Sequence, residues 1–282
     1  MQKAISKYWP VFVLPTLIAF IIGFIWPFIW GIFLSFQRFT TVSKTTFVGI
    51  QNYINVFQDS TFLHAFGFTA AFTVVSTVLI NVCAFAIALV LTRGIRGTNI
   101  FRTVYFMPNL IGGILLGYIW QILLNGVLAN LQKPLLALDA KAGFVGLVIL
   151  MCWQQIGYMM IIYVAGLQSV PGDLIEAAKI DGANEWKTFT AIAYPMIKPG
   201  VGALAIFTFI NSWNDYFMQL IMLSSTSNLT ISLGIAKLQA ENATDFGLIM
   251  AGAALAAVPI IVVFLIFQKY FTKGITMGAV KG

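Results

Sequence analysis

Charged residues are scarce in this chain of 282 residues. They make up 9% of the sequence, whereas hydrophobic residues make up 60%. A water-soluble domain usually contains about 25% charged residues. With a mean hydropathy of +0.91, the chain cannot fold as a single water-soluble globule. The composition instead predicts a helical membrane protein with several spans.

Histidine and cysteine are also nearly absent, with one His and two Cys. His64 alone cannot form a metal cluster, so a position at the surface or the membrane interface is the better interpretation. Cys83 and Cys152 both lie in apolar runs, which is typical of small core residues and not of a disulfide or a metal site. We therefore expect no metal site.

Motifs for nucleotide or hydrolytic chemistry are missing as well. The sequence has no G-x-x-x-x-G-K-[ST] phosphate loop, the signature of nucleotide-binding P-loops. It also has no set of Ser, His and Asp suited to catalysis and no basic patch interleaved with aromatics for nucleic acid. We expect no catalytic residue, no cofactor bound by this chain and no nucleic-acid partner.

What the sequence does contain is six long apolar runs. A membrane helix needs about 20 apolar residues, and six stretches meet this requirement: 11–36, 67–91, 104–124, 143–168, 200–223 and 247–271. No linker or low-complexity tract separates them, so we expect residues 1–282 to form one membrane domain. The predicted fold class is an all-α polytopic membrane protein with six transmembrane helices. We expect an amphipathic interfacial segment in the first outer loop, 37–66.

Lys and Arg residues predict the orientation. With the N-terminus inside, the inner segments hold eleven of these residues and the outer segments hold five. Because cytoplasmic loops are enriched in Lys and Arg, both termini are expected on the cytoplasmic side. Three of the eleven, Arg93, Arg96 and Arg102, lie in one short inner loop, where we interpret them mainly as topological anchors.

The longest polar passage covers residues 172–195. It contains four of the nine acidic residues, Asp173, Glu176, Asp181 and Glu185. Charges are costly in hydrocarbon, so this passage must lie in water or at the membrane surface. Its apolar residues recur with helical spacing on either side of Gly182. The pattern predicts two short helices joined by a turn on the cytoplasmic side.

The spacing in this passage resembles the EAA loop of ABC importer permeases. Three residues separate the E-A-A triplet from the glycine, nine residues then precede an isoleucine, and two more precede a proline. In that family the loop docks on a separate ATP-hydrolysing subunit. The resemblance implies the type I importer permease fold and coupling roles for Glu176, Ala177, Ala178, Asp181, Gly182 and Pro195.

The rest of the chain resembles the maltose and glycerol-3-phosphate type of these permeases. Residues 48–53 are similar to a "VGLxNY" passage of the first permease of such pairs, and residues 213–216 and 268–282 are similar to the second. The resemblance implies a carbohydrate permease of the bacterial cytoplasmic membrane. The implied partners are two ATPase subunits that bind ATP and Mg, a second permease or a second copy of this chain, and an extracytoplasmic solute-binding protein. It also makes Thr276, Gly278 and Lys281 candidates for contact with the ATPase.

Polar side chains inside the apolar runs are candidates for the transport pathway, because such residues are expensive in a membrane. Asp215 is the one charged residue away from the ends of the runs, about 24 Å from the cytoplasmic end of its run at 1.5 Å per residue. Amides and aromatic rings at similar depth would suit a sugar. Polar contacts between helices are the alternative role for them. The candidates are Asn81, Trp120, Gln121, Trp153, Gln154, Tyr158, Asn211, Trp213, Asn214 and Asp215.

Two functions from other classes remain open from the sequence. An ion-coupled secondary transporter of a small polar solute would need paired ionisable groups or interrupted helices near mid-membrane. A membrane enzyme would need a catalytic set, which the sequence lacks. No Lys or Arg lies in the middle of a run, and a phosphate would call for one. The sequence therefore favours a neutral sugar.

Overall fold

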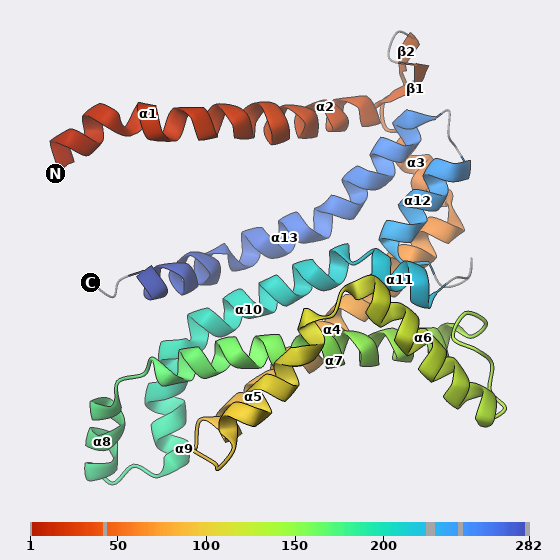
Figure 1. Ribbon diagram of the computed structural model, residues 1–282. Coiled ribbons are helices and arrows are strands. Elements are labelled where there is room, and N and C mark those ends of the chain that lie inside the picture. The colour runs from red at the N-terminus through yellow and green to blue at the C-terminus, as the bar shows by residue number, and fades with distance from the viewer. Residues whose placement is uncertain (1, 42–43, 224–228, 242–244, 280–282) are drawn as a thin grey trace. The chain divides into compact units, whose positions relative to one another are not determined.

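The computed structural model describes residues 2–41, 44–223, 229–241 and 245–279, with side chains from Trp9 to Tyr270 apart from those around the gaps. The chain is almost entirely helical (Figure 1). It forms two compact units, which are described separately. The first unit contains Met1–Leu63 and Gly234–Val258, and the second contains His64–Leu233 and Pro259–Gly282.

The first unit begins with a long helical span. It consists of α1 (Gln2–Phe20), a short π-helical stretch (Ile21–Ile25) and α2 (Trp26–Ser35). Proline at position 27 has no backbone N–H and would clash with the carbonyl of the preceding turn, and the wider π turn directly before it is a common way to absorb such a break. Nearly all side chains described on this span are exposed, as expected for a helix that faces lipid or another chain.

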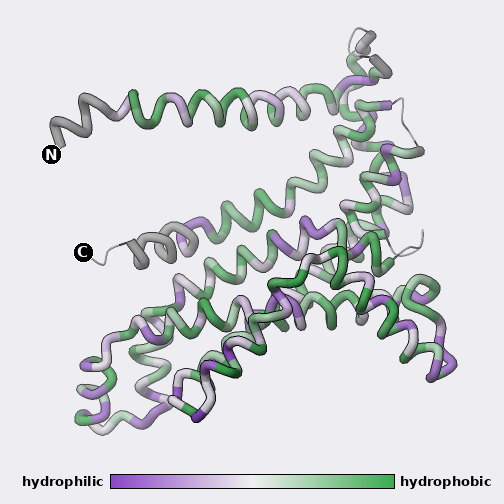
Figure 2. Tube along the Cα trace, viewed as in Figure 1, coloured by the Kyte–Doolittle hydropathy of each residue, from purple (hydrophilic) through white to green (hydrophobic). Residues whose placement is uncertain are grey.

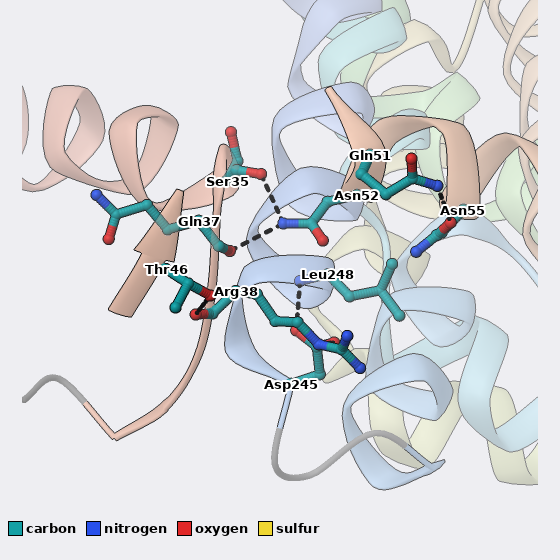
Figure 3. A network of polar contacts seen from close by, with 9 residues as sticks. All are labelled: Ser35, Gln37, Arg38, Thr46, Gln51, Asn52, Asn55, Asp245 and Leu248. Carbon is teal, nitrogen blue, oxygen red and sulfur yellow. Dashed lines mark hydrogen bonds and ion pairs between the residues drawn. The ribbon is translucent and has the colours of Figure 1, made fainter. Parts of the chain in front are cut away.

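A polar junction joins the end of this span to the rest of the first unit (Figure 3). A short hairpin, β1 (Gln37–Thr41) and β2 (Lys44–Phe47), precedes α3 (Gln51–Gln58). Asn52 is buried and its amide donates to the carbonyl oxygens of Ser35 and Gln37, at 2.9 Å each. This amide fixes the angle at which the chain leaves α2, which explains the Asn of the "VGLxNY" passage.

The start of α13 (Phe246–Ala279) packs into the same junction. Arg38 lies 3.7 Å from the Asp245 carboxylate, which also accepts a hydrogen bond from the Leu248 N–H. At Gly247 a Cβ would collide with the Gln37 carbonyl. The amphipathic segment that we expected in this loop is α3, but the β-hairpin was not predicted. The unit also holds most of α12 (Ile231–Glu241).

The second unit is a helical bundle built around α7 (Ala140–Gln168). Its other long helices are α4 (Ser60–Leu91), α6 (Gly113–Asn130) and α10 (Tyr194–Asn214). Half of the most apolar window of α7 is buried, the highest share among the spans. Its core side chains pack with those of α4, α6 and the short α11 (Phe217–Met222). α7 is therefore the central element of this bundle.

The predicted number of spans is confirmed in the described part of the chain, where six helices are long and apolar enough to cross a membrane. Two predicted spans differ from the structure. The run 104–124 is divided into α5 (Thr98–Phe106), a 3-10 turn (Met107–Leu110) and α6, because Pro108 and Gly112 interrupt the helix,. The run 200–223 is divided at Asp215 between α10 and α11.

Hydrophilic residues gather at the ends of the second unit, whereas its long helices are mainly hydrophobic (Figure 2). One such end carries α8 (Gly172–Ile180) and α9 (Glu185–Thr188), together with the loop between α4 and α5 (Figure 1). α6 and α11 lie toward the other end. This distribution is what a bundle needs when its ends meet water and its middle meets lipid.

Candidate functional site

The predicted helix–turn–helix is present between α7 and α10. α8 ends at Ile180, and Gly182 follows with a φ of +79°. Side chains rarely adopt this left-handed conformation, so glycine suits the turn. Asn184 then caps α9, because its side-chain oxygen accepts a hydrogen bond from the Lys187 N–H at 2.8 Å. Each half of the turn therefore has a local cause in the sequence.

The exposed side of this helix–turn–helix is partly apolar. Glu176 and Ala177 are exposed. Ile180 is 80% exposed and Trp186 is 73% exposed, although both side chains are strongly apolar. Ala178 faces the other way and is 7% exposed. We call Glu176, Ala177, Ile180 and Trp186 the coupling surface. Exposed Trp and Ile beside charged residues are typical of a protein-binding site.

An ion pair links α9, next to the coupling surface, to the loop between α4 and α5. Arg93, in the loop between α4 and α5, lies with its Nη2 atom 3.6 Å from the Glu185 Oε2 atom. Both side chains are largely exposed, so the pair contributes at most about 1 kcal/mol to stability. The pair places the loop between α4 and α5 and the helix–turn–helix at the same end of the second unit.

The second short helix is continuous with the long helix that follows it. α9 continues through a π-helical stretch (Phe189–Ala193) directly into α10. Pro195 lies in the first turn of α10, where its missing N–H is tolerated and the π turn before it takes up the altered register. One uninterrupted helical segment therefore runs from Glu185 to Asn214.

A cavity of about 520 Å³ lies in the second unit between α6, α7, α10 and α11. Its polar lining consists of amides and one carboxylate, and its apolar lining includes an aromatic ring. Gln154 and Gln155 come from α7, Asn211 and Asn214 from α10. The remaining lining residues are Gly113, Ile114, Met151, Ile210, Asp215, Phe217 and Met218.

The cavity lies where two membrane segments are interrupted. Gly113 and Ile114 directly follow the break between α5 and α6, and Asp215 forms the break between α10 and α11. The two distal pieces are joined, since the Gln121 amide donates to the Ile221 carbonyl at 2.7 Å. Irregular backbone within a membrane protein is tolerated where it is buried or lines a cavity. Such breaks are also typical of substrate sites in transporters.

Asp215 has two roles in this geometry. Its carboxylate interacts with the backbone N–H groups of Tyr216 and Met218 at the start of α11. Its Oδ2 atom is buried and has no hydrogen-bond partner in the described structure. The residue therefore fixes the break between α10 and α11 and holds one buried oxygen without a partner among the described residues.

Four of the ten predicted pathway residues line this cavity: Gln154, Asn211, Asn214 and Asp215. Others are bound elsewhere in the described structure. Asn81 accepts a hydrogen bond of 2.6 Å from the Tyr163 hydroxyl, and Trp213 is buried against Phe66 and Phe209. Trp120 and Trp153 pack on each other with ring centroids 5.3 Å apart. Tyr158 lies between Phe106 and Phe207.

Gln155 and the backbone at Gly113 were not among the predicted site residues. Gln155 is next to the selected Gln154, and the pair Gly112–Gly113 after Pro108 was the available signal of a broken helix. Of the predicted tail residues, Thr276 and Gly278 lie in α13, where only the backbone is described. Lys281 lies outside the described residues.

Comparisons with known proteins give one family. The family model described as "Binding-protein-dependent transport system inner membrane component" matches residues 97–277. The chain is 36% identical over 276 residues to the probable starch degradation products transport system permease protein AmyD of Thermoanaerobacterium thermosulfurigenes, with 94% of each chain covered. It is 32% identical over 231 residues to the sn-glycerol-3-phosphate transport system permease protein UgpA of Brucella abortus, covering 77% of this chain and 78% of UgpA.

The fold is also known. The structure is similar to a chain of a bacterial ABC transporter involved in the import of the acidic polysaccharide alginate, with a TM-score of 0.77 and 20% identity. The match covers 96% of this chain and 98% of that one. The chain therefore has the predicted fold of an ABC importer permease.

Proposed function

Because the chain belongs to the family of binding-protein-dependent transport system inner membrane components, we propose that it is the permease subunit of an ATP-binding-cassette importer for a carbohydrate. The coupling surface is the observation that carries this proposal. Exposed Ile180 and Trp186 stand at the polar end of a bundle that has no nucleotide motif of its own. Such a surface suits a soluble subunit that supplies the energy.

The partners follow from this arrangement. Two copies of an ATPase bind ATP and Mg and receive the coupling surfaces. A second permease, either a homologue or another copy of this chain, completes the pathway, and an extracytoplasmic solute-binding protein delivers the sugar. A transporter related in fold forms a complex with a periplasmic protein that holds an alginate pentasaccharide, which supports the last of these partners.

Transport proceeds by alternating access. Closure of the ATPases moves α8 and α9, and the helical segment from Glu185 to Asn214 carries this movement to the cavity. Binding of a ligand shifts such an equilibrium only when its affinity differs between the two states. The cavity amides at the end of this segment, Asn211 and Asn214, supply that difference when they move with it.

The chain crosses the bacterial cytoplasmic membrane with both termini and the coupling surface inside. The loops with few Lys and Arg residues then face outward, toward the binding protein. The relative AmyD is described as a permease for starch degradation products. Maltooligosaccharides are therefore the first sugars to test.

The test is to purify the tagged chain from membranes of its host and to identify the chains that accompany it. The isolated complex, placed in liposomes with the binding protein, should take up maltooligosaccharides only when ATP is supplied to the ATPase side. Uptake driven by a proton or sodium gradient without an accompanying ATPase would contradict the proposal and favour a secondary transporter.

A further inference from the structure

A separate apolar groove lies in the second unit, at the end that also carries α8 and α9. It has a volume of about 370 Å³ and is formed by the end of α4, the loop that follows and α5. None of its lining side chains is charged, and one hydroxyl is the only polar group among them. The lining residues are Ala86, Ile87, Val90, Leu91, Ile95, Phe101 and Tyr105.

This groove is open at the surface of the unit. Val90, Ile95, Phe101 and Tyr105 each remain about half exposed, although three of them are fully apolar and the fourth is an aromatic ring. Water finds few hydrogen-bond partners in an apolar cavity. Because α4 is one of the six helices apolar enough to cross a membrane, a hydrocarbon chain is the filling that suits this groove.

One end of the groove is strongly basic. Ile95 belongs to the lining and stands between Arg93 and Arg96 in the loop between α4 and α5. Arg102 follows in α5, so residues 92–106 contain three Arg and no Asp or Glu. An apolar groove thus ends beside a cluster of uncompensated positive charge.

Two of these arginines are accessible to an anion. Arg96 is exposed, and no acidic side chain lies within ion-pair distance of it in the described part of the chain. Arg93 is 3.6 Å from Glu185, but both side chains are largely exposed. Such exposed pairs are weak, so Arg93 can exchange the carboxylate for a phosphate. Guanidinium groups suit phosphate oxygens because they donate two parallel hydrogen bonds.

We propose that this groove binds an anionic phospholipid of the cytoplasmic leaflet. An acyl chain lies along Val90 and Phe101, and the phosphate lies at Arg93 and Arg96. The two parts of the groove match the two parts of this molecule, and basic pockets between spans on the cytoplasmic side bind anionic headgroups. This inference goes beyond the proposed function, because it concerns the lipid and not the transported solute.

A lipid site differs from a purely topological role of these arginines. Orientation in the membrane requires only the positive charge, whereas a lipid site requires both the charge and the groove. Arg96→Gln removes one charge and leaves the groove intact. Ala86→Phe fills the groove and leaves the charge intact, because Ala86 is an exposed residue of the lining.

The first measurement compares two lipids on the purified complex. Native mass spectrometry of the delipidated complex would follow titration with phosphatidylglycerol or with phosphatidylcholine of identical acyl chains. We expect phosphatidylglycerol to bind about tenfold more tightly, as two arginines close to one headgroup would produce. Equal affinity for the two lipids would overturn the proposal.

The second measurement locates the bound lipid. A phosphatidylglycerol with a photoactivatable group on its acyl chain should label peptides from 86–91 and 101–105 in the intact complex. Absence of label there, with the lipid or another chain of the complex found elsewhere on this surface, would overturn the proposal. A second permease that covers the groove would give this result.

Matched variants assign the effect to the groove. Arg96→Gln should weaken phosphatidylglycerol binding about fivefold, and Ala86→Phe should abolish labelling of the groove. The control for charge is Lys198→Gln, at an exposed cation of another predicted inner segment. The control for bulk is Val78→Phe, at an exposed residue of α4 outside the lining. Labelling that survives in both test variants as it does in both controls would refute the site.

Discussion

Gly182 is the residue on which the shape of the coupling surface depends. Its φ of +79° places the end of α8 and the start of α9 in a tight turn. No neighbouring atom lies within 4 Å of a Cβ at this position. The constraint is therefore conformational, and a side chain would clash only with its own backbone.

Replacing Gly182 with Val should uncouple transport. A β-branched residue disfavours the left-handed region by roughly 1–2 kcal/mol, so the turn would relax and shift Glu176 relative to Trp186. We expect ATP-driven uptake to fall at least about tenfold, while thermal stability in detergent stays nearly unchanged. Gly172→Ala is the control, since Gly172 has ordinary φ and open space. Normal uptake by Gly182→Val at normal expression would contradict a coupling role.

Trp186 should be an anchor of the contact with the ATPase. Buried Trp side chains at interfaces often contribute about 2 kcal/mol or more, which corresponds to roughly a thirtyfold change in affinity. Trp186→Ala should therefore reduce the amount of ATPase that copurifies with the chain. Phe47→Ala, at an aromatic residue that is also about three-quarters exposed but lies in the first unit, should leave it unchanged. Full recovery of the ATPase with Trp186→Ala would remove this residue from the interface.

At the residue scale, the sequence identified the polar residues within the spans better than it predicted what each of them contacts. Depth along a helix placed Asn81, Trp213 and Asp215 at a similar level, and of these three only Asp215 lines the cavity. Asn81 bonds to Tyr163, and Trp213 packs on Phe66. The facing direction of a residue depends on how helices rotate against one another, which their own sequences do not specify.

Among the elements, α7 and the end of α5 come into close backbone contact. A Cβ at Gly157 of α7 would collide with the carbonyl of Tyr105. This glycine allows the backbone of the interrupted third span to lie directly on the central helix. The position of the break between α5 and α6 therefore depends on the absence of a Cβ at Gly157.

Gly157→Ala should destabilise the bundle. Overpacking at a close contact costs about 1–3 kcal/mol, so the unfolding temperature in detergent should fall by several degrees. Gly166→Ala is the control in the same helix, because a Cβ there meets nothing within 4 Å and alanine favours helix. An unchanged unfolding temperature for Gly157→Ala would show that α5 can move away without cost.

The sequence predicted the six spans but not where they are interrupted. Apolar residues flank 107–112 and 215–216 on both sides, so a hydropathy pattern averaged over a window sees one span in each case. Pro108 and Gly112 were visible signals of the first break. The second break occurs at Asp215, where the helix ends because the carboxylate captures N–H groups of the next turn,.

On the scale of the whole molecule, the distribution of Lys and Arg predicts a cytoplasmic position for both termini and for the coupling surface. The structure places Arg93 beside Glu185, so the two loops predicted to be cytoplasmic lie at the same end of the second unit. The side of the membrane on which they lie remains a prediction from charge.

Cysteine labelling in whole cells tests this orientation. With Cys83 and Cys152 replaced by Ala, Lys133→Cys should react with an impermeant maleimide in intact cells, because Lys133 lies in a predicted outer loop. Lys179→Cys should react only after the membrane is opened. Both lysines are exposed, so unequal accessibility cannot explain a difference. The reverse labelling pattern would show the opposite orientation in the membrane and would exclude the proposed contact with a cytoplasmic ATPase.

The assignment of the whole chain depended on a few fixed positions. The spacing of Glu176, Gly182 and Pro195 led to the family that the comparisons confirm. The two compact units and the β-hairpin were not predicted, because contacts such as those of Asn52 join residues far apart in the chain.

The continuous helix from Glu185 to Asn214 has a mechanical consequence. Its 30 residues make about 45 Å of helix at 1.5 Å per residue, with Trp186 of the coupling surface near one end and two cavity amides at the other. The segment changes direction where α9 and its π turn meet α10 (Figure 1), and because π turns and prolines are where helices kink, this bend is the point at which a displacement of α9 is passed to α10. Two adjacent glycines in the middle of this segment should make it flexible. ATP hydrolysis should then continue while sugar uptake is lost.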